Sequence, residues 1–237
     1  MTTHSKRAYY TYDDGVSPHA PHWIIRAATG LLIVATVAGC QPVDGTGTSG
    51  APTGDSSTTS TEGGGGAASQ LDKLTVAKAG SMAGYSREKF PHWRSTGSNC
   101  DVRDSVLKRD GTKVKTSGCN VVAGSWKSIY DGLVLDSPTK VDIDHMVPLA
   151  NAWRSGASKW TTDKREDFAN DLEDPQLVAV SATSNRSKGD QDPSTWKPKQ
   201  TAAWCEYAQD WIAVKTHWKL TVTTAEKSAL NDMLEKC

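Results

Sequence analysis

The sequence lacks any excess of charge and is poor in apolar residues. It has 27 Lys and Arg against 27 Asp and Glu in 237 residues, and hydrophobic residues make up 37%. Residues 71–237 carry 24 basic and 22 acidic residues, a net charge of +2. This is not the strongly basic balance of a tight nucleic-acid binder. Any contact with nucleic acid must therefore come from a local patch, which the net charge neither supports nor excludes.

The N-terminal apolar run is too short to cross a bilayer as a mature helix. It follows Arg26, reads AATGLLIVATVAGC and ends in small residues directly before Cys40. This pattern resembles the lipobox of bacterial lipoproteins, in which the cysteine is lipidated and becomes the first mature residue. We therefore expect residues 1–40 to be a signal peptide with a lipobox. A plain signal peptide with an incidental cysteine is the alternative.

Residues 41–70 have almost no apolar side chains and are rich in Gly, Ser and Thr. Such a segment cannot bury enough surface to offset its ordering entropy, which predicts a disordered linker. A lipid on Cys40 followed by this linker would tether a folded domain, residues 71–237, to a membrane. We expect an exported protein that is either lipid-anchored and facing outward or secreted.

No C-x-x-C spacing occurs among the cysteines, which disfavours a zinc site. Apart from Cys40, four cysteines remain, and all lie in residues 71–237. An even number of cysteines in an exported domain predicts disulfides, and four cysteines allow three possible pairings. We favour two bonds between sequence neighbours. The paired residues are Cys100 with Cys119 and Cys205 with Cys237.

The pairing of Cys205 with Cys237 rests on two expected helices. Apolar residues recur at helical spacing in residues 201–218 and 223–237, and Thr223 and Glu226 fit a capping box. Each cysteine lies on the apolar face of its helix. Two consecutive helices of this kind would pack together and bring the thiols into contact.

The stretch KVDIDHMVPL is unusual, because an apolar strand carries aspartates although aspartate is depleted in strands. Neighbouring residues of a strand point to opposite faces, so Asp144 and His145 converge only where the strand ends or bends. Pro148 places that end nearby. Asp142 shares a face with Asp144 and is the reserve candidate for a ligand.

A second strand is expected at residues 177–180, and a short helix at about residues 185–188. Residues 161–173, between the two strands, have helical character. The expected order is therefore strand, helical insertion, strand and short helix.

These segments contain the groups that phosphodiester hydrolysis requires. His145 offers an imidazole that can deprotonate water near neutral pH. Asp144 and Asn185 offer hard oxygen ligands for a divalent ion, which stabilises developing charge. Arg186 and Lys188 can contact phosphate oxygens.

The pattern Asp-His-x-x-Pro, then a strand and Asn-x-x-Lys, resembles the ββα-metal motif of HNH endonucleases. Asparagine in the last position makes it similar to the HNH module of RNA-guided DNA nucleases. Residues 85–237 resemble exported bacterial HNH-family proteins. The resemblance implies Asp144 and Asn185 as metal ligands and His145 as general base. The family usually has asparagine where this chain has Gln176, which puts the bracing of the motif loop in doubt more than the chemistry.

Three other residues have open roles. Arg103 resembles a fixed arginine of these proteins, and we expect it either to reach the phosphate or to form a structural salt bridge. His92 and His217 are expected to be structural or incidental.

We therefore expect an α+β fold with a small ββα-metal (HNH) centre wrapped by helices, after the disordered tether. It would cut DNA, with RNA as the other candidate substrate, using one divalent ion, preferably Mg²⁺. The alternative function is a catalytically idle, envelope-associated binding module on the same fold. No obligate protein partner is inferred.

Overall fold

The computed structural model describes residues 62–237, so the predicted signal peptide, lipobox and Cys40 lie outside the described part. The α-helices are α1 (Glu62–Lys73), α2 (Val102–Asp110), α3 (Leu149–Arg154), α4 (Thr162–Ala169), α5 (Ala182–Lys188), α6 (Trp204–His217) and α7 (Thr224–Leu234). Short 3₁₀ helices are η1 (Arg87–Lys89), η2 (Pro138–Lys140), η3 (Ala157–Lys159) and η4 (Thr201–Ala203). The strands are β1 (Ser95–Gly97), β2 (Cys100–Asp101), β3 (Thr112–Ser117), β4 (Asn120–Lys127), β5 (Val134–Leu135), β6 (Val141–His145) and β7 (Leu177–Ser181). The described fold is thus α+β, as predicted.

The two strands β6 and β7 form an antiparallel pair whose register runs from Val141 opposite Ser181 to His145 opposite Leu177. Helix α5 follows β7 without a loop, because the Ser181 side chain accepts a hydrogen bond from the backbone N–H of Ser184 and caps the helix. The predicted order of strand, helical insertion, strand and short helix is confirmed. The cap makes α5 begin three residues before the predicted start.

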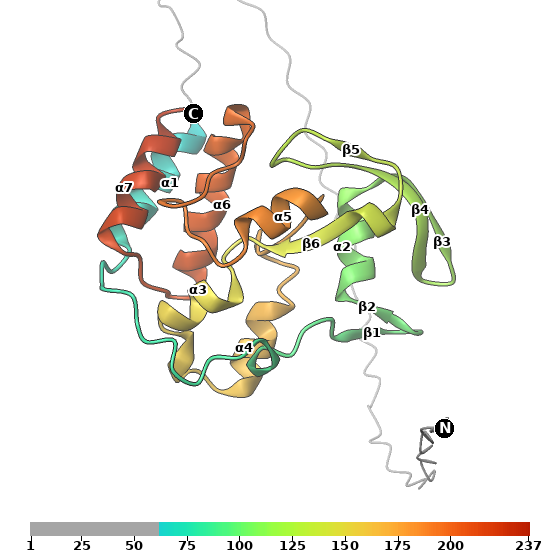
Figure 1. Ribbon diagram of the computed structural model, residues 1–237, viewed down its shortest axis with the longest axis horizontal. Helices are drawn as coiled ribbons and strands as arrows, with labels where there is room; N and C mark the ends of the chain where they lie inside the picture. The colour runs from blue at the N-terminus through green and yellow to red at the C-terminus, as the bar shows by residue number, and fades with distance from the viewer. Residues whose placement is uncertain (1–61) are drawn as a thin grey trace, which may run out of the picture. The chain divides into compact units, whose positions relative to one another are not determined.

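The β6–β7 pair lies between two hydrophobic clusters. Val141 and Ile143 of β6 join Leu177 and Ala179 of β7 in a cluster with α2 and β4. Val180 points the other way and joins the cluster of α1, α3, α4, α6 and α7. Figure 1 shows α1, α6 and α7 on one side of the pair, and α2 with β3, β4 and β5 on the other. Because side chains along β7 alternate between the two faces, the β6–β7 pair packs against a hydrophobic cluster on each face.

The predicted linker is wrong at its C-terminal end, because residues 62–70 belong to α1. Four glycines in this stretch disfavour a helix by propensity. Ala67 and Leu71 are nevertheless buried in the helical cluster, and α1 contacts α6 and α7. Tertiary packing overrides local composition here. Among residues 62–237, none of the helices has the length and apolar character of a membrane span.

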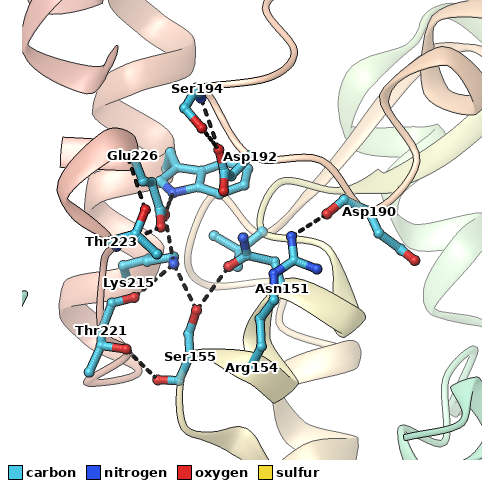
Figure 2. Close-up of polar contacts among 12 residues, drawn as sticks. Asn151, Arg154, Ser155, Asp190, Asp192, Ser194, Lys215, Thr221, Thr223 and Glu226 are labelled. Carbon is cyan, nitrogen blue, oxygen red and sulfur yellow. Dashed lines mark hydrogen bonds and ion pairs between the residues drawn. The ribbon is translucent and has the colours of Figure 1, made fainter. Parts of the chain in front are cut away.

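A buried ion pair connects α6 and α7 to the end of α3 (Figure 2). Lys215 Nζ lies 2.6 Å from Glu226 Oε1, and both side chains are buried. Lys215 also donates to Ser155 Oγ at 3.0 Å, and Trp211 Nε1 donates to Glu226 Oε1 at 2.6 Å. Glu226 completes the predicted capping box with Thr223. Buried charges are tolerated when they are paired and hydrogen-bonded in this way, so the network fixes how these helices meet.

Both predicted disulfides are present. Cys100 pairs with Cys119, with Cα atoms 5.6 Å apart, and Cys205 pairs with Cys237, with Cα atoms 5.0 Å apart. The second bond joins the first turn of α6 to the residue that follows α7 by three positions. It therefore covalently closes the helical pair that the Lys215–Glu226 contact also holds.

We predict that Cys237→Ser lowers the free energy of unfolding by about 3–4 kcal/mol, because the lost bond closes a loop between residues 32 apart. For a domain of this size the melting temperature should fall by roughly 10 °C. Cys205→Ser and the double variant should match the single variant, since any of the three removes the same bond. Additive losses in the double variant, measured by urea unfolding, would contradict this account.

Candidate active site

A cavity of about 210 Å³ lies where the end of β6 meets α5. It is lined by Asp144 and His145 from β6 and by Asn185 and Arg186 from α5. The other lining residues are Arg87, Ile143, Pro148, Leu149, Gly189 and Asp190. The strand ends at His145, and this end is what lets two neighbouring residues reach one cavity. Two segments about 40 residues apart in the sequence therefore meet at one place.

One carboxylate oxygen of Asp144 is occupied by two hydrogen-bond donors. Oδ2 accepts hydrogen bonds from the Tyr130 hydroxyl at 2.6 Å and from Lys188 Nζ at 2.5 Å. Within residues 62–237, Oδ1 has no hydrogen-bond partner, and the residue lines the cavity. Burial raises the pKa of Asp144, while the Lys188 ammonium and its hydrogen bond act in the opposite direction. Asp144 thus presents one free oxygen from a side chain that is held by two donors.

Lys188 is not placed where it was predicted to act. Its side chain is fully buried, and Nζ donates to Asp144 Oδ2 and to the backbone carbonyls of His145 at 2.8 Å and Met146 at 2.9 Å. Three acceptors match the three N–H bonds of an ammonium group. The predicted contact of Lys188 with a phosphate is therefore wrong. Positions 184 and 188 share the inner face of α5, and the sequence pattern alone did not reveal that orientation.

The imidazole of His145 is buried and has a defined tautomer. Nε2 lies 2.9 Å from the carbonyl oxygen of Ala169, which can only accept a hydrogen bond, so Nε2 carries the proton. Nδ1 is then the unprotonated nitrogen. Burial lowers the pKa of His145 to about 3, so the ring is neutral at neutral pH. The rings of His92 and Trp93 each lie 6.0 Å from it, centroid to centroid.

Asn185 is oriented by Asp142, which was predicted from the sequence as the reserve candidate for a metal ligand. Its Nδ2 donates to Asp142 Oδ2 at 3.1 Å. An ionised carboxylate only accepts, so the amide nitrogen must face Asp142 and the amide oxygen faces away. Arg186 lies farther from Asp142, with Nε 3.9 Å from Oδ2, and 79% of its side chain is exposed. Asp142 therefore positions Asn185, and Arg186 remains accessible at the rim of the cavity.

Comparison with known proteins places this arrangement in a family. Residues 101–233, more than half of the chain, match the family described as "GmrSD restriction endonucleases, C-terminal domain". The chain belongs to this family. A protein from the fungus Arthroderma benhamiae named "Uncharacterized secreted protein" is 52% identical over 172 residues, which cover 72% of this chain and 84% of the relative. No solved structure matches the chain.

Membership in the GmrSD C-terminal family indicates a nuclease-type function in general. The matched residues include β6, β7 and α5, so every lining residue of the cavity except Arg87 lies inside the family region. The bacterial and lipoprotein parts of the sequence resemblance are not addressed by these matches and stay predictions.

Gln176 braces the loop after β6 in this GmrSD domain, although asparagine was expected in that position. Its side chain is fully buried. Oε1 accepts from the backbone N–H of Val147 at 3.1 Å, and Nε2 donates to the carbonyl of Val147 at 3.0 Å. The backbone carbonyl of Gln176 also accepts from the N–H of Met146 at 2.7 Å. The extra methylene of glutamine thus does not prevent bracing, and the doubt raised by the sequence is removed.

Arg103 does not line the cavity. Its guanidinium donates to the carbonyl oxygens of Pro138 at 3.0 Å and Val141 at 2.9 Å, at the entry to β6. This position favours a structural role. The contact is not the expected salt bridge, because Arg103 donates to backbone carbonyl groups and not to a carboxylate. Its predicted contact with the substrate has no support from this geometry.

Two residues of the site were missed by the sequence reasoning. Tyr130, which holds Asp144, is fully buried and lies 14 positions before it in the chain, so no local pattern announces it. Arg87 lines the cavity and has no carboxylate partner within residues 62–237. It lies near the start of residues 85–237, which carry the family resemblance, but only the fold brings it to the cavity.

We predict that Gln176→Ala lowers the free energy of unfolding by about 2–6 kcal/mol. The variant leaves the N–H and C=O of Val147 buried without partners, and each such group costs about 1–3 kcal/mol. Gln191→Ala is the matched control, because Gln191 is exposed and makes one surface hydrogen bond to the carbonyl of Ser187. Urea unfolding measures both. Equal effects of the two variants would show that the brace contributes nothing.

Proposed function

We propose that this protein is an exported, metal-dependent endonuclease of the HNH type that hydrolyses phosphodiester bonds of DNA. One observation carries the proposal. Three residues that line a single cavity each have one acceptor atom without a partner in residues 62–237, while neighbouring groups occupy the other polar atom. The free atoms are Asp144 Oδ1, Asn185 Oδ1 and His145 Nδ1. The antiparallel β6–β7 pair followed by α5 is consistent with a ββα centre and supports the proposal.

Two of the free atoms fit a divalent ion. A carboxylate oxygen and an amide oxygen are hard ligands, which Mg²⁺ prefers. Among the described residues, no group of three or more His, Cys, Asp or Glu side chains could hold a metal. An ion at Asp144 and Asn185 would therefore keep several waters, as Mg²⁺ usually does. A bound Mg²⁺ would stabilise the negative charge that develops on the phosphate and on the leaving oxygen.

His145 would act as the general base. The carbonyl of Ala169 fixes the ring with Nδ1 unprotonated, so this nitrogen can accept a proton from an attacking water. A base works best when its pKa lies near the working pH. A phosphodiester in the cavity would bring a negative charge close to the ring and raise the pKa of His145 toward that range. The substrate would in this way strengthen the base that attacks it.

Arg186 and Arg87 are the side chains best placed to bind the phosphate. Both line the cavity, both are exposed, and a guanidinium can contact phosphate oxygens in bidentate fashion. Lys188, the other predicted contact, is excluded by its burial. Products with 5′-phosphate and 3′-hydroxyl ends are what the HNH resemblance implies.

Export is supported by two disulfides, which persist in oxidising compartments, and by a relative named as secreted. Lipidation at Cys40 remains part of the proposal. The rival function, an idle binding module, rested on Gln176 and on the neutral net charge. Gln176 no longer supports it, because its side chain braces the loop, whereas the neutral net charge still does.

We predict that His145→Ala reduces cleavage of plasmid DNA by about 10²–10⁴-fold, the usual contribution of a positioned base. His217→Ala is the matched control, because His217 is exposed and lies outside the cavity. It should retain wild-type activity. Circular dichroism should show both variants folded. A His145→Ala protein with more than about a tenth of wild-type activity would refute the assignment.

We predict that Asp144→Asn and Asn185→Ala weaken Mg²⁺ binding in calorimetry and lose most activity, because each removes an oxygen ligand or its charge. Asp144→Asn keeps a hydrogen-bond acceptor for Lys188 but removes the charge that balances its ammonium, so circular dichroism should confirm that the variant is folded. Asp232→Asn and Asn231→Ala, at exposed positions of α7, are the matched controls. Full cleavage by the wild type in excess EDTA would rule out the metal.

A further inference from the structure

A hairpin whose own strands carry no acidic residue lies apart from the cavity. No Asp or Glu occurs in residues 111–130, which include the hairpin of β3 and β4. Lys113 and Lys115 of β3 are exposed, as is Lys108 near the end of α2. None of the three has a carboxylate partner among residues 62–237. Lys127 is different, because it lines a separate cavity together with Glu206 and Asp210.

A second ribbon adjoins this hairpin. Residues 92–100 contain no acidic residue, and β1 and β2 pair around an exposed turn at Ser98 and Asn99. Asp101 ends β2, but its carboxylate caps α2 by accepting from the backbone N–H of Asp104. The Cys100–Cys119 disulfide joins this ribbon to the turn between β3 and β4. Figure 1 shows both ribbons at the same edge of the domain, beyond α2. Arg94 does not add to the available charge, because it pairs with Glu166 and Asp167.

The ribbons are rigidly connected to the candidate active site. Val121 and Trp126 of β4 are buried in the same cluster as Val141 and Ile143 of β6. At the start of the other ribbon, the ring of Trp93 lies 6.0 Å from that of His145. A nucleic acid held by the ribbons would therefore have a fixed position relative to the cavity.

We propose that the β3–β4 ribbon, with Lys108 of α2 beside it and the β1–β2 ribbon joined to its turn by the disulfide, binds the backbone of double-stranded DNA beside the scissile bond. Exposed lysines without carboxylate partners can neutralise phosphates, and a two-stranded ribbon fits the major groove of B-DNA. The major groove of duplex RNA is too deep and narrow for such an element. The proposal rests on the proposed nuclease function for its substrate and narrows that substrate to duplex DNA.

The test is a variant with Lys108, Lys113 and Lys115 all changed to Gln. Anisotropy of a labelled DNA duplex, measured with the full chain in EDTA to prevent cleavage, should show affinity at least about tenfold weaker at 0.1 M salt. The slope of log affinity against log salt concentration should fall by about two to three units, because each lost phosphate contact removes roughly 0.9. Hydrolysis of bis(p-nitrophenyl) phosphate with Mg²⁺ should be unchanged, since this ester does not reach the ribbons.

Two control variants make the result specific. Changing Lys73, Lys78 and Lys236 to Gln removes the same charge from exposed positions outside the ribbons and should leave affinity and slope unchanged. Arginine at positions 108, 113 and 115 should restore both. Unchanged DNA affinity in the Gln variant, no DNA binding by the wild type in EDTA, equal affinity for duplex RNA, or a parallel loss of ester hydrolysis would overturn the proposal. A wild type that hydrolyses neither DNA nor the ester would instead refute the nuclease function, while the binding measurement would still test the ribbons.

Discussion

The candidate site depends on one buried ion pair, between Lys188 of α5 and Asp144 of β6. An ammonium group without water is costly unless all its N–H bonds find acceptors and its charge is balanced. Lys188 meets both conditions only when α5 docks against the end of β6, where it reaches Asp144 and two backbone carbonyls. The desolvation cost of the Lys188 ammonium therefore disfavours any other position of α5. Asn185, three residues before Lys188, is brought to the cavity by the same docking.

Hydrogen bonds around the cavity decide which atoms remain available for chemistry. Tyr130 and Lys188 occupy one oxygen of Asp144, the carbonyl of Ala169 occupies one nitrogen of His145, and Asp142 occupies the amide nitrogen of Asn185. A carbonyl or carboxylate oxygen can only accept, so these partners fix the tautomer of His145 and the amide orientation of Asn185. The supporting residues thus determine the reactive atoms as much as the identities of the three side chains do.

Local patterns in the sequence predicted what depends on local chemistry. The capping box at Thr223, the order of strands and helices, and the disulfide between two amphipathic helices follow from periodicity and spacing. Contacts between distant segments did not follow. The burial of Lys188, the approach of Arg87 and the role of Tyr130 exist only after the chain folds. Residues 62–70 show the converse, because packing of Ala67 and Leu71 gives a helix where composition alone predicts none.

The structure divides the work of stabilisation between covalent and non-covalent contacts. Neither disulfide touches β6, β7 or α5; one joins the exposed ribbons and the other closes the helical pair at the C-terminus. The centre is held by buried polar groups, namely the Lys188–Asp144 pair and the Gln176 brace, and by a cluster on each face of the strands. The ribbons have only a few residues in those clusters and carry exposed lysines. A covalent link is the contact that can keep such a polar surface rigid without burying the groups that would face a nucleic acid.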